Sequence, residues 1–424
     1  MKNCLVLLTK TYPFDKGEEF IENEVPLLSK SFEQVIIIAT STTGQPVQTR
    51  ATAKNVLVFY IPASKIKKRL PYEAIKLFPF TGYKGYCDEA ERKAIQVSSK
   101  RKLYLAYFIA KAESVFQYSR KILENCNLNQ FEGVTFYSYW LYDTAAAALK
   151  LKEYFPLKST RVVSRAHGYD LYPSRNSFHY LPLRNYILKR IDGVYVCSHN
   201  GSDYLKEQYP AYRDKIHTAY LGTIDHGISN FKPDDALHIV SCCHISPVKR
   251  VEILAQALSL LKDSGVKLRW THFGGGDGLE ELKHFASQSL NFMAFHFAGE
   301  VKNAELLDFY QNNPVDLFVN TSSSEGLPVS IMEAVSFGIP VLATDVGGTG
   351  EIVRENETGF LLDADLTASA LAEKLKFFSS LPREERDRLK RNCRSLWQEQ
   401  FNAICNFTRF ACEIAPNKAL KPGS

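Results

Sequence analysis

The sequence predicts an α/β protein with two Rossmann-like domains, each a doubly wound parallel sheet, and an interdomain cleft that holds the ligands. Three observations predict this fold class. The chain has 424 residues, more than one hydrophobic core usually supports, and suits two domains of roughly 200 residues each. Both halves alternate short β-rich runs with helix-length segments, as parallel sheets covered on both faces do. A polar segment over residues 223–236 lies between the halves and predicts a linker.

The N-terminal domain is expected over residues 1–224. An insertion-like stretch from about residue 63 to 102 interrupts its pattern. Its strands are predicted from runs rich in β-branched and aromatic residues: NCLVLL, QVIIIAT, NVLVFYI, GVTFYS, TRVVSR and GVYVCS.

The C-terminal domain is expected over residues 225–395. Helices are predicted at Val251–Asp263 and Asn303–Asn312. From Leu389 to Ala415 apolar residues recur three or four positions apart as in a continuous helix, and the part over 396–424 is expected to pack back toward the N-terminal domain. Buried strands are predicted at 237–243, 267–273, 292–297, 315–320 and 340–344.

Composition limits where the protein works. No stretch reaches the roughly 18 uninterrupted apolar residues that a spanning helix needs, and the start of the chain lacks a cleavage-site pattern. We therefore expect a cytoplasmic protein, with the inner face of the cell membrane as the alternative location. The nine cysteines include no C-x-x-C pair, so neither a zinc site nor a disulfide framework is indicated.

Charge is distributed unevenly along the chain. Residues 1–224 contain 32 Lys and Arg against 20 Asp and Glu, a balance of +12, whereas the remainder has −6. This asymmetry favours contact with an anionic membrane or a phosphorylated lipid over nucleic acid, and a merely soluble basic face is the alternative. Residues 64–86 interleave lysines with aromatic residues, which is typical of a membrane-contacting segment or, alternatively, of a disordered or partner-facing insertion.

The most informative stretch is TSSSEGLPVSIMEAVSFGIPVLATDVGG, residues 321–348, with Glu325 and Glu333 eight positions apart. It predicts a strand, a loop and a helix that starts near Pro328 and ends before Gly338. Gly326 lets the backbone come close to a ligand. A helix N-terminus at the carboxyl edge of a sheet suits a diphosphate, whereas carboxylates accept hydrogen bonds from sugar and ribose hydroxyls. The alternative is that Glu325 only stabilises the helix N-terminus and that Glu333 is an exposed surface acid.

This segment resembles the donor-site motif of the retaining glycosyltransferases of family four, also called group one, which have the GT-B fold. The resemblance implies that Glu325 contacts hydroxyls of the transferred sugar and that Glu333 binds the nucleotide ribose. The backbone expected to face sugar and phosphate is that of Gly326, Leu327, Pro328 and Val329. The resemblance is specific over roughly residues 236–410 and general before them.

The segment SCCHISPVKRVEILAQAL, residues 241–258, predicts a strand followed by a helix after Pro247. Lys249 is a flexible point charge able to reach a diphosphate and stabilise the departing nucleotide; a solvated surface lysine is the alternative. Relatives of this stretch usually have an arginine where this chain has His244. A neutral histidine can donate one hydrogen bond but lacks the guanidinium fork, so a purely structural role stays open.

Two segments of the N-terminal half carry further candidates. His167 in VVSRAHGYDLY, residues 162–172, resembles the histidine that projects across the cleft towards donor sugar and phosphate, although a lone histidine is more often structural. The loop TYPFDKGEEFIENEVPLL, residues 11–28, resembles the family's glycine loop but has Gly17 alone. Its acids from Glu18 to Glu24 can equally form a solvated helix face.

Two other patterns are discounted. FGGGDG, residues 273–278, has Leu279 where a dinucleotide-binding motif needs a third glycine, so it predicts no nicotinamide site; it instead resembles the family's glycine-rich turn, with Gly274 at the donor site. Asp363 and Asp365 are better explained by helix capping than by a metal. We expect no cofactor and no divalent metal.

The resulting hypothesis is a retaining glycosyltransferase that moves a hexose or related sugar from a nucleotide diphosphate sugar to a hydroxyl of a saccharide or lipid-linked acceptor, in surface polysaccharide synthesis. Lys249, Glu325 and His167 are the candidate catalytic residues. The resemblance implies front-face substitution, in which the leaving phosphate helps to deprotonate the acceptor. A GT-B sugar-nucleotide epimerase and a nucleotide-sugar-binding partner of another transferase stay open as alternatives.

Overall fold

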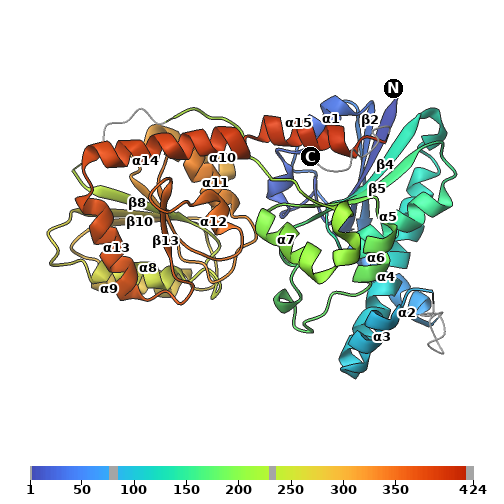
Figure 1. Ribbon diagram of the computed structural model, residues 1–424, viewed down its shortest axis with the longest axis horizontal. Helices are drawn as coiled ribbons and strands as arrows, with labels where there is room; N and C mark the ends of the chain where they lie inside the picture. Colours follow the sequence, from blue (N-terminus) through green and yellow to red (C-terminus); the bar gives the residue numbers. More distant parts are fainter. Residues whose placement is uncertain (1, 76–84, 229–234, 417–424) are drawn as a thin grey trace. The chain divides into compact units, whose positions relative to one another are not determined.

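The computed structural model describes residues 2–75, 85–228 and 235–416 (Figure 1). It consists of two compact units. Unit 1 comprises residues up to Leu221 together with those from Ala403 on, and unit 2 comprises Gly222–Asn402. Each unit is built on one parallel sheet, so the predicted pair of Rossmann-like domains is confirmed.

Unit 1 contains a seven-stranded sheet in the order β3-β2-β1-β4-β5-β6-β7. All neighbouring strands are parallel. The strands are β1 (Asn3–Thr9), β2 (Gln34–Thr42), β3 (Val56–Pro62), β4 (Gly133–Ser138), β5 (Thr160–Ala166), β6 (Gly193–Val196) and β7 (Ile216–Thr218). The helices are α1 (Val25–Ser31), α2 (Ala63–Ile75), α3 (Glu89–Gln96), α4 (Ser99–Leu123), α5 (Asp143–Tyr154), α6 (Arg184–Arg190), α7 (His199–Gln208) and α15 (Ala403–Ile414).

Strand β1 shows why this sheet is buried on both faces. Its side chains alternate between the two faces, as in any strand. Val6 and Leu8 lie in a core with Phe108 of α4, whereas Leu5 and Leu7 lie in a second core with Phe410 of α15. A strand that is buried on both faces of the sheet consists of consecutive apolar residues, which is why β1 could be predicted from the sequence.

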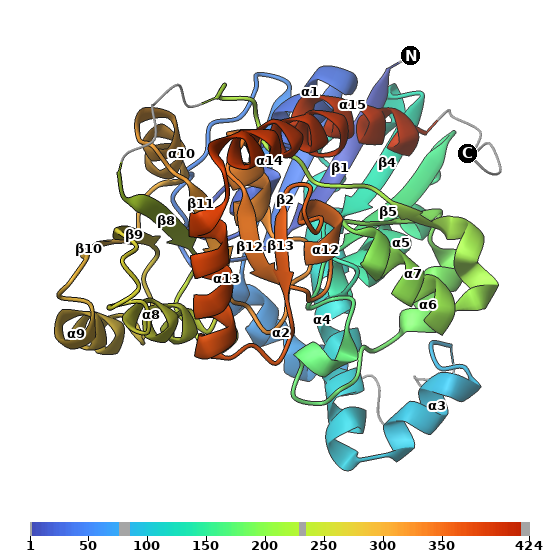
Figure 2. The same ribbon diagram turned by 60° about the vertical axis from the view of Figure 1, so that its left-hand side comes forward.

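The C-terminal helices form two elements in place of the predicted continuous one. Helix α14 (Arg383–Leu396) is followed by a π-helical turn, Trp397–Phe401, and by Asn402 in an extended conformation before α15 begins. Helix α15 packs beside α1 in unit 1, as both ribbon views show (Figure 2). The Thr135 hydroxyl of β4 donates a 2.7 Å hydrogen bond to the Ile414 carbonyl at the end of α15. The apolar spacing continues across the break, because each part covers its own core.

Unit 2 contains a six-stranded parallel sheet in the order β10-β9-β8-β11-β12-β13. The strands are β8 (Leu237–Cys242), β9 (Leu268–Phe273), β10 (Ala294–Gly299), β11 (Leu317–Asn320), β12 (Val341–Thr344) and β13 (Gly359–Leu362). The remaining helices are α8 (Val251–Ser259), α9 (Leu279–Ser289), α10 (Asn303–Asn312), α11 (Val329–Ser336), α12 (Thr349–Ile352) and α13 (Ala368–Ser380).

Strand β10 corrects one prediction. The sequence predicted a buried strand at residues 292–297, but β10 lies at the edge of the sheet and pairs with β9 alone. Its side chains alternate between exposed and half-buried positions. A strand at the edge of a sheet has a neighbouring strand on one side only, so its side chains are less fully covered. The sequence does not reveal which strand lies at the edge.

In each sheet, the direction in which successive strands are added reverses once. In unit 1 the reversal lies between β1 and β4, and in unit 2 between β8 and β11. At such a switch point the loops leaving the carboxyl ends of neighbouring strands diverge, and open α/β sheets bind ligands there. Within the described residues, no helix is long and apolar enough to cross a membrane.

Candidate functional site

The switch point of unit 2 brings two predicted residues into direct contact. Lys249 lies in the turn that follows β8, and Glu325 lies in the loop that follows β11. The Lys249 Nζ atom is 2.6 Å from Oε1 of Glu325. The Asn320 side-chain amide donates to the same oxygen over 3.3 Å. The lysine is therefore an ordered half of an ion pair rather than a solvated surface charge.

The ion pair leaves part of Glu325 available. Both recorded hydrogen bonds reach Oε1, and within the described chain no donor reaches Oε2. An ionised carboxylate has about four acceptor sites on its two oxygens. The free oxygen can therefore accept from a ligand hydroxyl while Lys249 holds the other one.

A helix begins directly after this loop. Pro328 occupies the N-cap position and α11 runs from Val329 to Ser336, so Pro328 precedes the first turn in which it was predicted. Gly338 follows the helix with φ +75°, which matches its predicted position past the C-terminus. Gly326 and Leu327 connect Glu325 to the helix start. The Val329 and Ser330 N–H groups at the start of α11 have no intrahelical acceptor and can donate to an anion, whereas the Ile331 N–H donates to the Pro328 carbonyl over 3.2 Å.

Glu333 lies on α11 and is buried, so the alternative of an exposed surface acid is wrong. Its Oε1 accepts a 2.7 Å hydrogen bond from the Asn303 side chain at the start of α10. Burial raises the pKa of Glu333 to about 7, and the Asn303 hydrogen bond opposes part of this rise. Burial raises the pKa of the Cys242 thiol at the end of β8, and the charges of Glu333 and Lys249 act on this pKa in opposite directions.

The glycine-rich turn after β9 packs against the loop after β8. Gly274 has φ +131°, and a Cβ there would lie 1.9 Å from the Cys243 carbonyl oxygen. Gly276 has φ +138°, and its Cβ would lie 2.3 Å from the Ile245 carbonyl oxygen. His244 lies between these two contacts and is exposed. Close backbone packing accounts for both glycines, and the donor contacts expected of Gly274 and His244 stay predictions.

Sequence reasoning did not single out Gly347. Its φ is +58°, and a Cβ there would lie 2.0 Å from the Glu325 carbonyl oxygen. The next residue, Gly348, donates its N–H to the Gly326 carbonyl over 2.8 Å. The glycine pair after β12 therefore supports the loop that carries Glu325. The signal was present in the sequence as the pair that ends the motif of residues 321–348.

His167 lies in unit 1, directly after β5. Its ring packs against Tyr139 and Trp140, each 4.8 Å away between centroids, and against Phe20 at 5.5 Å. Both ring nitrogens are buried and have no hydrogen-bond partner within the described residues. The carboxylate of Asp170 accepts the His167 backbone N–H over 2.8 Å, and its Oδ2 lies 3.9 Å from Nδ1. The histidine thus has unused hydrogen-bonding capacity at a strand's carboxyl end.

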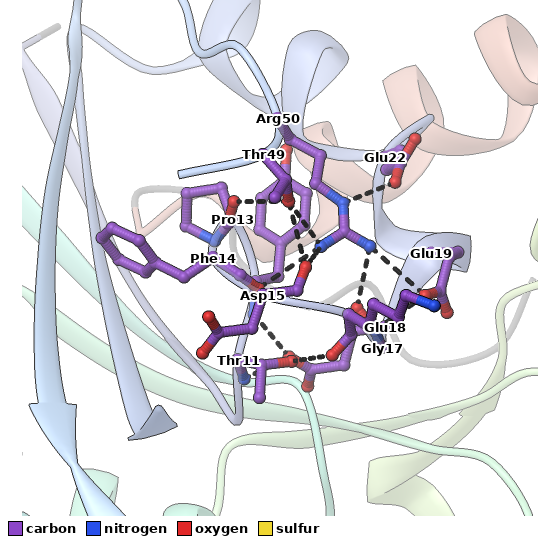
Figure 3. A network of polar contacts seen from close by, with 12 residues as sticks. Thr11, Pro13, Phe14, Asp15, Gly17, Glu18, Glu19, Glu22, Thr49 and Arg50 are labelled. Carbon is purple, nitrogen blue, oxygen red and sulfur yellow. Dashed lines mark hydrogen bonds and ion pairs between the residues drawn. The ribbon is translucent and has the colours of Figure 1, made fainter. Parts of the chain in front are cut away.

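Gly17 lies in the loop after β1, with φ +102°. Arg50 holds this loop from the segment between β2 and β3 (Figure 3). Its Nη2 donates to the Gly17 carbonyl over 3.1 Å, and its Nε donates to Glu22 over 2.7 Å. Further guanidinium bonds reach the Phe14 and Asp15 carbonyls. The loop is therefore ordered by an arginine that no local pattern in the sequence singled out.

Two acids of this loop do not belong to a solvated helix face, whereas Glu19 and Glu22 are exposed and pair with Arg50. Glu18 is buried, and Glu24 is completely buried. Glu24 pairs with Arg165 over 2.9 Å and accepts the Tyr137 hydroxyl over 2.7 Å. The alternative of a solvated face is wrong at these two positions, because Glu24 has partners on β4 and β5, and Glu18 accepts backbone N–H groups of its own loop and the Trp140 indole.

Asp363 and Asp365 require another correction. Both are exposed, and neither caps a helix. The N-cap of α13 is Thr367, whose hydroxyl accepts the Ala370 N–H over 3.2 Å. Across residues 2–75, 85–228 and 235–416, no group of three potential metal ligands gathers in one place. That metal is not required stays a prediction.

Parts of this chain are similar in sequence to known glycosyltransferases. Residues 225–396 match the family described as "Glycosyl transferases group 1". The chain is 25% identical over 265 residues to the putative colanic acid biosynthesis glycosyltransferase WcaL of Escherichia coli K12, which covers 60% of this chain and 64% of WcaL. It is 41% identical over 108 residues to the O-antigen biosynthesis glycosyltransferase WbnH of Escherichia coli, which covers 26% of this chain and 28% of WbnH. The chain therefore matches less than two thirds of the length of either relative.

Solved structures resemble nearly the whole chain. Sucrose-phosphate synthase from Thermosynechococcus elongatus superposes with a TM-score of 0.65 at 16% identity, covering 97% of this chain and 98% of that one. Anabaena Alr3699/HepE, solved in complex with UDP and glucose, gives a TM-score of 0.61 at 14% identity, covering 97% and 99%. At these identities the likeness shows the fold, and the predicted GT-B fold is confirmed.

Proposed function

Residues 225–396 of this chain form a group 1 glycosyltransferase domain, and from that premise we propose that the protein is a retaining glycosyltransferase. Its donor is a nucleotide diphosphate sugar carrying a hexose or related sugar. Its acceptor is a hydroxyl of a saccharide or of a lipid-linked saccharide. WcaL and WbnH are named for colanic acid and O-antigen synthesis, which supports a role in surface polysaccharide synthesis.

The observation that carries the proposal is the Lys249–Glu325 pair at the switch point of unit 2. It presents a cation and a carboxylate with a free oxygen side by side, next to the N-terminus of α11. A nucleotide diphosphate sugar requires this combination, because it is anionic at the pyrophosphate and rich in hydroxyls on both sides. A site for an anion alone would have no use for the carboxylate.

The residues then have distinct roles. Lys249 and the first amides of α11 bind the diphosphate and stabilise the charge that develops on it as the glycosidic bond breaks. The free oxygen of Glu325 accepts a sugar hydroxyl, and His167 of unit 1 contributes a second polar contact to the sugar. His244, Gly274 and Gly17 are proposed to approach the phosphates. Front-face substitution, in which the leaving phosphate helps to deprotonate the acceptor, leads to retention.

Glu333 is proposed to bind the ribose hydroxyls. Its second oxygen, Oε2, has no hydrogen-bond donor among the described residues. An ionised carboxylate accepts both hydroxyls, whereas a protonated one loses an acceptor site. Since burial raises the pKa of Glu333 to about 7, donor affinity should fall as pH falls below neutrality.

The acceptor side is proposed to lie near an anionic membrane surface. The balance of +12 over residues 1–224 supports this contact. Within the predicted segment 64–86, α2 presents Lys65, Lys67 and Lys68 as exposed side chains. Lys76 and Lys84 lie outside the described residues. Co-sedimentation with anionic vesicles but not with neutral vesicles is the expected result, and equal binding to both would contradict it.

The main experiment combines a donor panel with product analysis. UDP-, GDP- and dTDP-sugars are screened by thermal shift, because a ligand bound by the folded state alone raises the melting temperature. The stabilising donor is then incubated with saccharide acceptors, and the anomeric configuration of the product is determined by NMR. Retention is the expected result, and an inverted product would overturn the mechanism. Isomerisation of donor alone identifies an epimerase, and binding without transfer to any acceptor identifies a binding partner.

The site itself is tested with Glu325→Gln. The amide keeps the size of the side chain but replaces an acceptor oxygen with a donor group, so the ion pair and a sugar contact are both weakened. We expect kcat to fall on the order of a hundredfold. Glu280→Gln is the matched control, because Glu280 lies on α9 in the same unit with an 83% exposed side chain. Equal activity of both variants would exclude Glu325 from the site.

A further inference from the structure

Arg250 directly follows Lys249 and has a left-handed backbone, with φ +49°. This region of backbone conformation favours glycine, because a Cβ crowds the neighbouring carbonyl oxygen. The arginine at this position therefore adopts a backbone conformation that its own Cβ disfavours. Its side chain is therefore the place to look for a compensating role.

The guanidinium of Arg250 connects three loops. Its Nε donates to the Thr321 carbonyl over 2.8 Å, and its Nη2 donates to the Ser322 carbonyl over 3.2 Å. Its Nη1 donates to the Ala364 carbonyl over 2.8 Å. Thr321 and Ser322 begin the loop that leads to Glu325, and Ala364 follows β13. All three acceptors are backbone carbonyls, so the contacts set the course of the main chain.

The loops are also bonded in the opposite direction. The Thr321 hydroxyl donates to the Lys249 carbonyl over 2.8 Å and to the Arg250 carbonyl over 3.0 Å. The Ser323 N–H donates to the Val248 carbonyl over 2.8 Å. The loop after β8 and the loop after β11 therefore form one hydrogen-bonded unit, with Arg250 as its charged centre.

We propose that Arg250 is a positioning residue that sets the separation between Lys249 Nζ and the Glu325 carboxylate, and through it the affinity for the donor diphosphate. This inference rests on the proposed function. Arg250 bonds to backbone carbonyls and acts through its two neighbours along these loops. Its planar fork reaches carbonyls on two loops at once, which the single ammonium group of a lysine cannot do.

The left-handed backbone at position 250 allows the loss of side-chain hydrogen bonds to be tested separately from backbone strain. Arg250→Gly removes the three side-chain bonds and relieves the left-handed backbone, so a loss of function in this variant cannot come from backbone strain. Arg250→Lys keeps the charge and the strain but loses the fork. Asn356→Gly is the matched control, because Asn356 is a left-handed residue of unit 2, with φ +61°, located in the exposed turn before β13.

The experiment measures the dissociation constants of UDP and GDP by calorimetry, together with donor KM and kcat for the wild type and the three variants. We expect Arg250→Gly and Arg250→Lys to weaken nucleoside diphosphate binding and raise donor KM by on the order of tenfold, and to lower kcat as well. Asn356→Gly is expected to match the wild type. Unchanged Kd and KM in both Arg250 variants would overturn the inference.

A purely structural role has a different signature. It would reduce the concentration of folded, titratable binding sites and leave the Kd and KM of the remaining sites unchanged, which also overturns the inference. Failure of the proposed function is separately visible in the donor panel, in which the wild type would then bind none of the UDP-, GDP- and dTDP-sugars. Nucleotide binding that is present in the wild type and weaker by on the order of tenfold in both Arg250 variants supports the positioning role.

Discussion

The two units place a glutamate at the same topological position and use it in opposite ways. In unit 1, Glu18 lies at the β1/β4 switch point, and in unit 2, Glu325 lies at the β8/β11 switch point. The carboxylate of Glu18 accepts four N–H groups from its surroundings. They are the backbone amides of Lys10, Thr11 and Tyr12, at 3.0, 2.8 and 2.9 Å, and the Trp140 indole at 2.6 Å. Glu325 has two donors, both on one oxygen.

Burial does not distinguish the two glutamates, since Glu18 is 6% exposed and Glu325 is 8% exposed. Saturation does. A carboxylate whose acceptor sites are all used fixes loop geometry, whereas one with a free oxygen has capacity left for a ligand. Counting donors around a buried acid therefore separates a structural role from a binding role more sharply than its exposure.

A second pair extends this comparison to charge. Glu24 of unit 1 is paired with Arg165, which is also fully buried and lies 4.2 Å from the Phe410 ring centroid. Glu333 of unit 2 has the neutral Asn303 as its partner. Among the described residues, the structural acid thus has a counter-ion and the proposed ribose-binding acid has none, and burial raises the pKa of Glu333 to about 7.

The largest expected effect comes from breaking the buried pair of unit 1. Arg165→Met leaves Glu24 as an uncompensated buried charge, and we expect a loss of about 3–5 kcal/mol in the free energy of unfolding. Chemical unfolding followed by circular dichroism measures it. Adding Glu24→Leu removes the charge as well and should restore much of the loss. A single variant as stable as the wild type would show that the pair does not have the structural role assigned to it.

Glu333→Gln should have the next largest effect and the opposite sign. Burial raises the folded-state pKa from 4.5 to about 7, so the wild type has its full stability below pH 4.5 and loses this contribution as pH rises through 7. Glutamine does not titrate. The variant should therefore be more stable than the wild type by about 3 kcal/mol at pH 8, and the difference should shrink towards pH 5. Unfolding free energies at pH 5, 6.5 and 8 test this, and a difference independent of pH would contradict it.

Glu18→Gln should have the smallest effect. A glutamine cannot accept four N–H groups, and its own NH₂ faces donors, so we expect a loss of about 1–3 kcal/mol in stability. Glu33→Gln is the control, because Glu33 is exposed just before β2. Donor affinity, measured by calorimetry, should be unchanged in both variants. If Glu18→Gln abolished donor binding at normal stability, Glu18 itself would bind the donor and the comparison would fail.

Much of the fold was predictable because its signals are local. Parallel strands buried on both faces appear as continuous apolar runs, and β8, β9, β11 and β12 were located to within about two residues. Lys249 and Glu325 were found because each follows such a run. Since the carboxyl ends of parallel strands meet at one sheet edge, their proximity could be expected.

The missed features depend on partners far away in the sequence. Arg250 meets Thr321 and Ala364, separated from it by 71 and 114 positions, and Arg165 meets Glu24 across 141. No local sequence pattern predicts these contacts. For the same reason, a solvated face was a reasonable alternative for Glu24, whose partners Tyr137 and Arg165 lie 113 and 141 positions away.

Order along the chain was enough to predict two parallel-sheet units and the residue types at the strand ends, because hydrophobic periodicity and glycine placement are local features of the sequence. Which of those polar residues remain available to a ligand was settled by folding. Hydrogen-bond saturation depends on every donor that packing brings within about 3 Å, and most donors to Glu18, Glu24, Glu325 and Glu333 arrive from other elements. A carboxylate's identity is a property of the sequence, but its spare capacity is a property of the folded chain.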